Sequence, residues 1–412
     1  MFTGNTGRRY GVIKNLWPVK KWNMPQRPTD SIHAYDIIIA GMGCAGLSLA
    51  SRMVAQGKFS DKKILLIDRV PKTQNDRTWC FWEKGQGFFE SIVHHQWPKT
   101  WVHGDGFSQC LDISPYTYKM IRGNDFYAYN LRILKGQSNF TILQEEVVEV
   151  HPDGWVGTAG GNRFHAPLIF NSIPSPRPPA TEKLIWMLQH FKGWVIKTAD
   201  PVFDPAEATL MDFRVDQARG TCFVYVMPFD NHTALVEYTL FSAELLEDEE
   251  YDVGLDTYIR QYVTAGSFSV MDKEFGIIPM TNHRFPSGKG AIIPIGTSGG
   301  QTKGSSGYTF QFIQKQSRLL VDQLARHYDT GARFKPVGQT PARFRFYDSV
   351  LLDVLRHQRM PGHQVFLQLF RKNKPAQVLK FLDNESTISE EASVILSLPV
   401  GPFLKAAMHQ LF

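Results

Sequence analysis

The chain has 412 residues, of which 43% are hydrophobic and 20% are charged, and this composition excludes a largely disordered protein. The net charge of +6 favours a negatively charged partner, and the charge alone leaves open nucleic acid, a phosphate-bearing cofactor and an anionic membrane surface. The four cysteines have neither zinc-site spacing nor the density of a disulfide scaffold, so we expect reduced thiols, a cytoplasmic location and no metal site.

Residues 1–34 are predicted to form a basic, poorly ordered arm. They carry six lysine or arginine residues and no acidic residue before Asp30, and they lack the compact apolar stretch of a signal peptide. Such an arm either contacts anionic lipid or is a solvated tail without function, and the sequence leaves both interpretations open.

Residues 35–100 are typical of the opening of a Rossmann-type domain. An apolar strand at 36–40 leads into Gly41, Gly43 and Gly46, a helix follows to about residue 56, and a second apolar strand ends in Asp68. Strands that are apolar throughout are buried on both faces, so we expect a parallel sheet covered by helices.

The glycine spacing predicts a dinucleotide site. Gly41 permits the tight turn, Gly43 lets a pyrophosphate approach the backbone, and Gly46 allows the helix to pack closely on the strand. The free N–H groups at the start of the helix then bind the phosphates. Asp68 lies 22 residues after Gly46, where an acceptor for a ribose hydroxyl is expected. The alternative is an unrelated glycine-rich turn, which the flanking strands and helix disfavour.

Residues 101–290 change to short strands separated by Asp, Gly, Asn and Pro turns. This pattern predicts a mainly antiparallel substrate-binding domain with interleaved segments of the first domain. The clearest unit is a hairpin of strands 221–227 and 233–241, joined by the turn 229–232. Both faces of these strands are largely apolar, so at least one face should line a core or an apolar cavity.

Residues 291–343 are predicted to return to the first domain. An apolar strand leads into a second glycine-rich turn, which contains Gly296, Gly299, Gly300 and Gly307, and a helix follows over about 308–327. Two such turns about 250 residues apart favour FAD over a nicotinamide nucleotide as the resident cofactor. Backbone amides of the second turn would stabilise negative charge on a reduced flavin, whereas a plain flexible loop is the alternative.

Residues 344–412 are predicted to be helical, and no apolar run reaches the roughly 18 to 20 residues that a membrane-spanning helix needs. Basic residues lie there among large apolar ones, which suits binding at a membrane surface and equally suits a helical layer packed on the core. These basic residues are Arg356, Arg359, Arg371, Lys372, Lys374 and Lys380. Asp348 and Asp353 are interpreted as solvent-exposed helix residues and not as catalysts.

Four stretches carry a resemblance to a known family: the turn 41–46, RTWCFWE at 77–83, VEYT at 236–239, and 296–310 with its GYTF ending, of which the second and third are much more specific than the first. Through them the chain resembles the lycopene cyclases, a branch of the FAD-binding hydroxylase and reductase superfamily, over about 35–398. The stretch 274–280 also resembles a cyclase strand that borders the flavin and the substrate. Two positions depart from these patterns. Thr297 stands where flavin hydroxylases usually have an aspartate, and Tyr238 stands where cyclases more often have a second carboxylate.

The resemblance implies acid-initiated closure of the linear ends of lycopene into beta-ionone rings, without net redox change and with reduced FAD, for which NADPH would be the reductant. It implies that Glu237 is the acid, although the residues alone would favour an ordinary exposed strand glutamate. Glu83 is the second candidate carboxylate, for proton removal or for holding the flavin, and the reduced flavin itself is an alternative proton donor. Nearby aromatic residues either stabilise a carbocation or form ordinary core, and these are Trp79, Phe81, Trp82, Tyr225 and Tyr238.

The alternative enzyme is an FAD-dependent reductase or hydroxylase of an isoprenoid or carotenoid, and the alternative outside catalysis is a flavin-binding protein at a membrane. Because lycopene lives in the bilayer, the resemblance implies carotenoid ligands and peripheral association with the membrane. Nucleic acid is excluded as a partner, since no stacking platform or recognition motif accompanies the basic residues. The sequence leaves open one-ended or two-ended cyclisation, the oligomeric state and protein partners.

Overall fold

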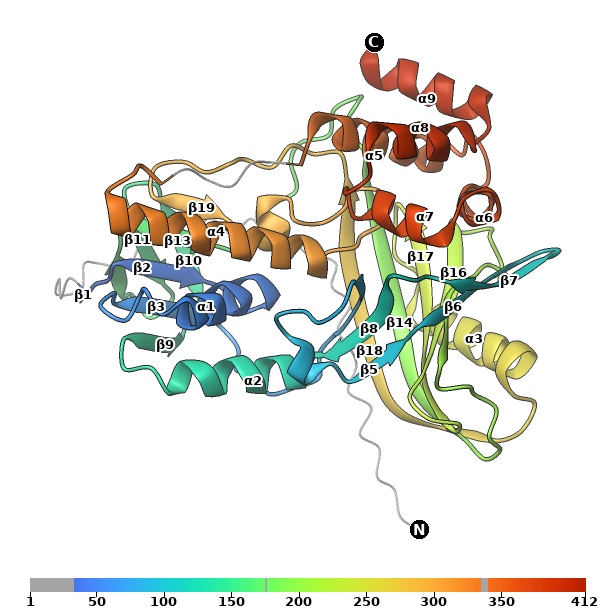
Figure 1. Cartoon of the computed structure of the whole chain (residues 1–412), viewed down its shortest axis with the longest axis horizontal. Coiled ribbons are helices and arrows are strands. Elements are labelled where there is room, and N and C mark those ends of the chain that lie inside the picture. Colours follow the sequence, from blue (N-terminus) through green and yellow to red (C-terminus); the bar gives the residue numbers. More distant parts are fainter. Residues whose placement is uncertain (1–32, 175, 335–339) are drawn as a thin grey trace.

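The computed structural model describes residues 33–334, apart from residue 175, and residues 340–412. The expected basic arm at 1–34 therefore lies almost entirely outside the described residues. Figure 1 shows two lobes side by side, one built of short strands and helices and one built around a sheet of long strands, with a group of helices above the second lobe. The expected α/β class with a large, mainly antiparallel second sheet is confirmed.

The first lobe contains a five-stranded sheet in which all neighbouring strands are parallel, in the order β19-β13-β2-β3-β9. Its strands are β2 (Ile37–Ala40), β3 (Ile64–Asp68), β9 (Phe140–Gln144), β13 (Leu168–Asn171) and β19 (Ile292–Pro294). Every residue of β2 is buried, as its continuous apolar sequence predicts for a strand covered on both faces.

Helices cover one face of this sheet, and a small second sheet covers the other. Ile37 and Ile39 pack toward the helices, whereas Ile38 packs toward the small sheet. The helices are α1 (Cys44–Gln56), α2 (Gly123–Lys135) and α4 (Phe310–Thr330). The small sheet contains β1 (His33–Ala34), β10 (Val147–His151), β11 (Trp155–Thr158) and β12 (Arg163–His165). The expected cover of helices is thus found on one face only, because burial of a strand does not reveal what kind of layer covers it.

The second lobe contains a seven-stranded sheet, antiparallel except for the parallel pair β15 and β6. In spatial order its strands are β18 (Phe268–Thr281), β14 (Trp186–Thr198), β17 (Thr233–Ser242), β16 (Thr221–Pro228), β15 (Glu207–Asp212), β6 (Lys99–Gly104) and β7 (Phe107–Asp112). The predicted hairpin is confirmed as β16 and β17. Both of its strands are buried almost throughout, so each face of the large sheet carries an apolar layer.

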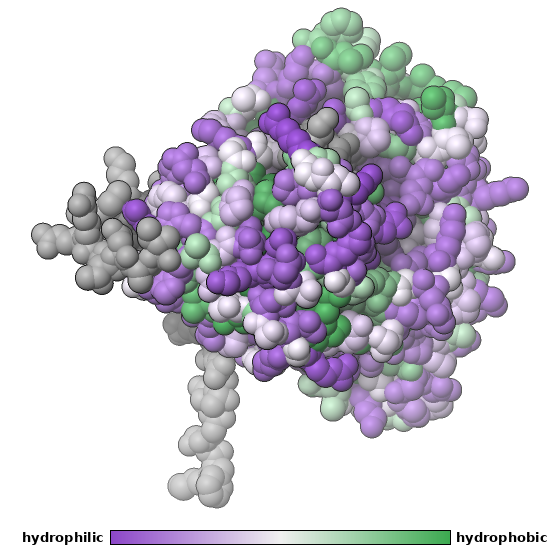
Figure 2. Space-filling model, turned by 60° about the vertical axis from the view of Figure 1, so that its left-hand side comes forward, coloured by the Kyte–Doolittle hydropathy of each residue, from purple (hydrophilic) through white to green (hydrophobic). Residues whose placement is uncertain are grey.

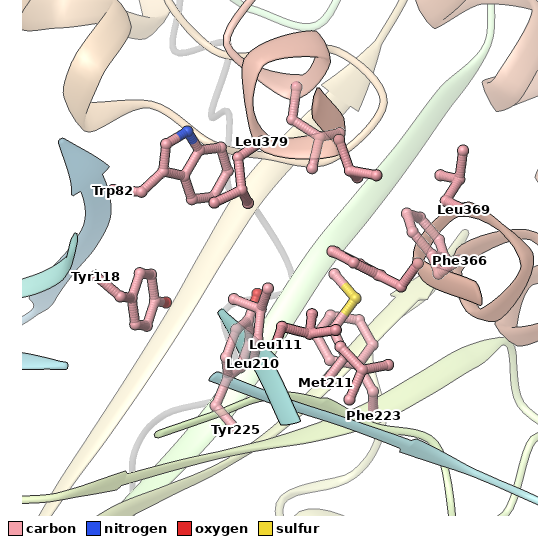
Figure 3. Close-up of a cluster of buried hydrophobic side chains, with 14 of the residues drawn as sticks. Trp82, Leu111, Tyr118, Leu210, Met211, Phe223, Tyr225, Phe366, Leu369 and Leu379 are labelled. Carbon is pink, nitrogen blue, oxygen red and sulfur yellow. The ribbon is translucent and has the colours of Figure 1, made fainter. Parts of the chain in front are cut away.

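The two faces of the large sheet are covered by different elements. Helix α3 (Asp248–Tyr258), which continues as a π-helical turn over Ile259–Val263, packs on the face that carries Val236 and Tyr238. The opposite face, which carries Leu235 and Phe241, packs against the C-terminal helices and a three-stranded sheet. That sheet contains β4 (Thr78–Glu83), β5 (His95–Trp97) and β8 (Thr117–Arg122). Figure 3 shows side chains of the large sheet meeting those of the C-terminal helices.

Five helices form the C-terminal layer. They are α5 (Ala342–Arg356), α6 (Gly362–Lys372), α7 (Pro375–Leu382), α8 (Ile388–Leu396) and α9 (Val400–Leu411). Single 3-10 turns lie elsewhere, at Glu90–Ile92 and Gly296–Gly299. Among the helices of the described part of the chain, none is both long and apolar enough to span a membrane.

Candidate active site

The turn between β2 and α1 leaves space and free N–H groups for a phosphate. Gly41 has a φ of +97°, which glycine favours, and a β-carbon there would lie 2.2 Å from Oγ of Ser172. A β-carbon on Gly46 would lie 2.0 Å from the carbonyl oxygen of Gly41, so α1 approaches the strand only because glycine stands there. At Gly43, the N-cap of α1, a β-carbon would meet nothing within 4 Å, and no side chain caps the helix. The turn therefore fits a pyrophosphate at a helix N-terminus.

Asp68 ends β3 beside this turn. Its Oδ2 accepts a hydrogen bond from the N–H of Met42 at 2.7 Å, and its Oδ1 accepts one from the N–H of Val70 at 3.1 Å. Nζ of Lys72 lies 3.2 Å from Oδ2. The acceptor predicted for a ribose hydroxyl is thus held next to the glycine turn.

The second glycine-rich turn lies against the first. A β-carbon on Gly296 would lie 2.8 Å from Cβ of Ala45 in α1, so the two turns approach each other closely. Three further glycines of the turn would each place a β-carbon against a neighbour: Gly299 at 2.6 Å from the carbonyl oxygen of Pro294, Gly300 at 3.1 Å from Cδ2 of Phe285, and Gly307 at 1.9 Å from Oε1 of Gln189. Close packing, and not only flexibility, therefore accounts for the glycines of this turn.

A cavity of about 90 Å³, here called the Glu237 cavity, lies between the large sheet, β4 and the end of the second turn. Sequence stretches that lie far apart in the chain converge on it. The stretch 77–83 contributes Thr78, Trp79 and Cys80, the stretch 236–239 contributes Glu237, and the stretch 296–310 contributes Gly307, Tyr308, Thr309 and Phe310. The rest of the lining is Ile278 of β18 together with Tyr118, Gln189, Phe191, Tyr225 and Met227. Three of the four stretches that carry the family resemblance thus line the same cavity.

Glu237 faces this cavity in a row of residues that runs across four strands. Its neighbours in register are Tyr225 on β16 and Gly193 on β14, and Gly193 in turn lies opposite Glu274 on β18. Because Gly193 has no side chain, the strand between Glu237 and Glu274 does not place a side chain of its own between them. A β-carbon at Gly193 would lie 3.0 Å from Cγ of Glu274. Two glutamates from strands that are not direct neighbours therefore face each other.

Each of these carboxyl groups has a threonine donor. Oγ1 of Thr239 donates to Oε1 of Glu237 at 2.9 Å, and Oγ1 of Thr78 donates to Oε2 of Glu274 at 2.7 Å. Burial raises the pKa of Glu237 well above its usual range, and the neighbouring Glu274 raises it further. Burial also raises the pKa of Glu274, although the hydrogen bond from Thr78 opposes that shift. The arrangement can thus keep a carboxylic acid protonated near neutral pH.

Glu83 lies apart from this pair. It is the last residue of β4 and is partly exposed, and its Oε2 lies 3.2 Å from Nζ of the buried Lys119. The same ammonium group contacts Glu90 at 2.6 Å. Glu83 does not belong to the lining of the Glu237 cavity. Of the two carboxylates selected from the sequence, the structure brings only Glu237 to the cavity.

The aromatic candidates divide between the cavity and the core. Trp79 and Tyr225 line the Glu237 cavity. Phe81 and Trp82 are buried in core clusters on opposite sides of β4. Tyr238 lies on the face of the large sheet that packs against α3, because neighbouring residues of a strand point to opposite faces. Only Trp79 and Tyr225 are therefore placed to contact a ligand in this cavity.

Asp348 and Asp353 are buried, so their interpretation as solvent-exposed helix residues is wrong. Nζ of the buried Lys303 donates to Oδ1 of Asp348 at 2.6 Å and ties the second glycine-rich turn to α5. Asp353 accepts hydrogen bonds from Arg359 and from His409, and so joins α5 to α9. Helical periodicity marks a polar face, but it does not show that another segment packs over that face.

The comparison with known families decides the assignment. The family model described as lycopene cyclase protein matches residues 36–408. The chain belongs to the lycopene cyclase family. Among relatives of this family member, a lycopene beta-cyclase of Pantoea ananas is 26% identical over 239 residues, which are 52% of this chain and 54% of that protein. A chloroplastic neoxanthin synthase of Solanum tuberosum is 24% identical over 332 residues, which are 73% of this chain and 62% of that protein. The matches therefore span less than two thirds of either relative.

Solved structures of flavoproteins share the fold. A geranylgeranyl bacteriochlorophyll reductase-like protein from Thermoplasma acidophilum has a TM-score of 0.58 and 12% identity, covering 91% of this chain and 96% of that chain. A flavoprotein/dehydrogenase from Cytophaga hutchinsonii has a TM-score of 0.54 and 11% identity, covering 92% of this chain and 99% of that chain. At these identities the likeness shows the fold alone. This lycopene cyclase family member thus shares its fold with these two proteins, one named as a reductase-like protein and one as a flavoprotein.

The second carboxyl at the site of this family member was not identified as a site residue from the sequence. Glu274 opens a stretch that resembles a cyclase strand, and Gly193 interrupts an otherwise bulky strand. A glycine within a long strand signals a close approach of other groups, so it could have indicated the meeting point. Which strand carries the partner depends on strand order and register, which the sequence does not specify.

Proposed function

We propose that this chain is a lycopene beta-cyclase, which closes the linear ends of lycopene into beta-ionone rings without net oxidation or reduction. The observation that carries the proposal is a buried carboxyl, Glu237, whose pKa is raised at a cavity walled by the family's sequence stretches. The match to a relative named lycopene beta-cyclase supports the substrate class.

The residues around Glu237 suit acid-initiated ring closure. The reaction begins with a proton delivered to a terminal double bond, which requires an acid that stays protonated near neutral pH. Trp79 and Tyr225 present aromatic groups to the cavity, where they would stabilise a carbocation and keep water from capturing it. Loss of a ring proton completes the isomerisation, so no electron is consumed.

We infer that FAD is the resident cofactor, that its reduced form is the active one, and that NADPH is the reductant. Gly43 leaves room for a pyrophosphate, and Asp68 lies beside that turn for a ribose hydroxyl. The second turn approaches the first at Gly296 and reaches the Glu237 cavity at Gly307, so a nucleotide held by both would extend toward the acid. When bound, reduced FAD would supply an electron-rich ring near a developing cation, or the proton itself.

We infer further that the protein docks on a membrane through an apolar surface of α8 and α9, here called the α8–α9 patch. Its exposed residues are Ile388, Leu396, Val400, Leu404, Met408, Leu411 and Phe412. Figure 2 shows this apolar surface at the top of the molecule, where the C-terminal helices lie in Figure 1. Phe412 is 94% exposed and Leu396 is 77% exposed, which is unfavourable in water and suits the boundary of a bilayer. Lycopene would enter from that bilayer.

The mass of the product tests the proposed activity. With chemically reduced FAD and no oxygen, we expect purified protein to convert lycopene into a cyclic product of unchanged mass, with many turnovers for each flavin. A carotenoid reductase would add hydrogen and a hydroxylase would add oxygen. Consumption of one NADPH for each ring formed would contradict the isomerase proposal.

The Glu237→Gln variant tests the acid. The amide is nearly isosteric and cannot donate an acidic proton, so we expect the rate to fall about 100- to 10,000-fold while bound FAD stays at the parental level. Glu237→Asp withdraws the acid by one methylene and should lose on the order of a hundredfold. The matched control is Glu149→Gln, which changes an exposed strand glutamate on β10 and should keep the parental rate. If FAD-loaded Glu237→Gln forms cyclic product at the parental rate, Glu237 is not the proton donor, and the reduced flavin takes that role.

A further inference from the structure

We propose that Glu274 is the positioning partner of the site acid, and that Glu237 and Glu274 hold a single proton between them. This inference rests on the proposed function and adds to it a residue outside the family's acidic stretch. In this chain Tyr238 occupies the place next to Glu237 where a second carboxylate is common in the family, and Tyr238 faces α3. Position 238 points away from the cavity, so the carboxyl that meets Glu237 comes from β18, on the far side of β14.

The register of the large sheet makes this pairing possible. Neighbouring strands lie about 4.8 Å apart, so β17 and β18 are separated by roughly 10 Å. Two glutamate side chains span that gap only if the residue between them leaves the path open, and Gly193 stands there. A β-carbon at Gly193 would lie 2.9 Å from Leu235 and 3.0 Å from Glu274, so any larger residue there would displace the Glu274 side chain that reaches across it.

The hydrogen bonds of the pair require a proton. Thr239 donates to Glu237 and Thr78 donates to Oε2 of Glu274. Oε1 of Glu274 is buried and has no hydrogen bond of ordinary geometry from another group in the described residues. The group that faces it is the carboxyl of Glu237, which donates a hydrogen bond only when it is protonated. If Glu237 is protonated and Glu274 is ionised, the Glu237 O–H donates to Oε1 of Glu274, and that buried oxygen then has a hydrogen-bond partner.

The surroundings of the pair favour one shared proton over two charges. The groups that act on Glu237 are Glu274 and Thr239, and those that act on Glu274 include Asp272 of β18 and Asp76, which lies before β4. The titratable groups packed around Glu237 are Cys80 of β4, Tyr118 of β8, Tyr225 of β16 and Tyr308 of the second turn. Within the described ranges, none of the groups with the largest effects on either carboxyl is a cation. Two adjacent ionised carboxylates without a cation are unfavourable, so the pair retains a proton.

The proton then cycles without net change. The O–H bond of Glu237 breaks as a C–H bond forms on the terminal double bond, and the positive charge appears on the adjacent carbon. The next double bond attacks that carbon and closes the ring. A ring C–H bond breaks, its electrons form the ring double bond, and the proton returns to the pair. While the cation exists the pair carries two negative charges, which stabilise the cation electrostatically.

An infrared pH titration of purified holoprotein tests the pair without substrate. We expect a carboxyl C=O band that is absent from Glu237→Gln to persist through neutral pH in the parent, and this assignment separates it from Asp383, whose pKa burial raises to about 7. In Glu274→Gln, which removes the neighbouring charge, the band should disappear about one pH unit or more lower. In Thr78→Val, which removes the donor that stabilises ionised Glu274, the band should persist to higher pH than in the parent. Opposite shifts from two variants distinguish a shared proton from a general loss of structure.

The pH dependence of cyclisation provides the second readout. Because the proton must be on the pair, kcat/KM of the parent should fall as pH rises through the raised pKa of the pair. Glu274→Gln should lose about tenfold at neutral pH and recover toward lower pH, whereas Glu274→Asp should lie between it and the parent. Glu149→Gln should match the parent in both measurements.

Two outcomes would overturn the shared proton: no protonated carboxyl band at neutral pH in the parent, or an unshifted band in Glu274→Gln. A parent that shows the expected band and shifts but makes no cyclic product would instead contradict the proposed function and leave the pair supported. The two failures are therefore distinguishable.

Discussion

Lys303 is a buried lysine whose partners come from α5 and from the segment that follows α7. Its Nζ donates to Oδ1 of Asp348 at 2.6 Å and to Oδ1 of Asn384 at 2.8 Å, and Oγ of Ser305 donates to the same Asp348 oxygen. Asp348 lies in α5, and Asn384 follows α7. The sequence places Lys303 in a glycine-rich turn, where a solvated side chain would be expected. Its burial arises from the helices that pack over the turn, which local sequence does not predict.

The Asp348→Ala variant tests this connection. It would leave the Lys303 ammonium buried with too few acceptors, and breaking a buried pair by removing one partner typically costs about 3–5 kcal/mol. We expect the urea midpoint of unfolding to fall accordingly, with little change in the denaturant slope. Asp153→Ala, which removes an exposed aspartate, should change the free energy of unfolding by no more than about 0.5 kcal/mol. Equal stability of Asp348→Ala and the parent would mean that Asn384 alone suffices as an acceptor for Lys303.

At the scale of elements, the sequence predicted what depends on neighbours along the chain. The strand, glycine turn and helix at 36–56 follow from local pattern, and so does the alternation that places Glu237 and Tyr238 on opposite faces. The second carboxyl could not be predicted in the same way. Glu274 meets Glu237 only because β14 lies between β17 and β18 in this register, and that order is a property of the whole sheet.

Two glycines of the turn between β2 and α1 separate cofactor binding from folding. A β-carbon at Gly43 would meet no protein atom within 4 Å, so we expect the apoprotein of Gly43→Val to fold like that of the parent. The same side chain would occupy the place of the pyrophosphate, so bound FAD should be lost. By contrast, a β-carbon at Gly46 would lie 2.0 Å from the carbonyl oxygen of Gly41, so Gly46→Val should lower the melting temperature of the apoprotein as well.

The ratio of flavin absorbance to protein, together with the melting temperature of each apoprotein, separates these two effects. Stoichiometric FAD in Gly43→Val would show that the nucleotide does not use this turn. Release of a nucleotide other than FAD on denaturation of the parent would contradict the cofactor proposal.

At the scale of the whole molecule, the C-terminal helices connect the proposed membrane surface to the site. Val394 of α8 is buried in the same cluster as Leu235 of β17, and Leu235 lies on the sheet face that carries Glu237. The opposite side of α8 exposes Ile388 and Leu396. Other C-terminal helices thus lie between the α8–α9 patch and the sheet on which the acid lies, since α9 packs on α5 and α8 packs on α7. The basic residues between Arg356 and Lys380, which the sequence suggested for membrane binding, do not belong to this patch. Most of its exposed apolar residues lie on α9, further along the chain.

Membrane docking through the α8–α9 patch can be measured by flotation with lipid vesicles. Leu404 and Met408 lie one helical turn apart on the exposed side of α9. If both insert at the bilayer boundary, changing both to glutamate removes on the order of 3 kcal/mol of apolar burial, which corresponds to at least about a hundredfold weaker partitioning. The matched control changes Val253 and Met271 to glutamate, since these residues are similarly exposed but lie on α3 and β18, away from the patch.

We expect the parent and the control to float with vesicles and the α9 variant to remain in the aqueous fraction. The α9 variant should still cyclise lycopene presented in detergent, because the Glu237 cavity is untouched. Equal flotation of the α9 variant and the parent, or a parent that does not float, would contradict docking through this surface.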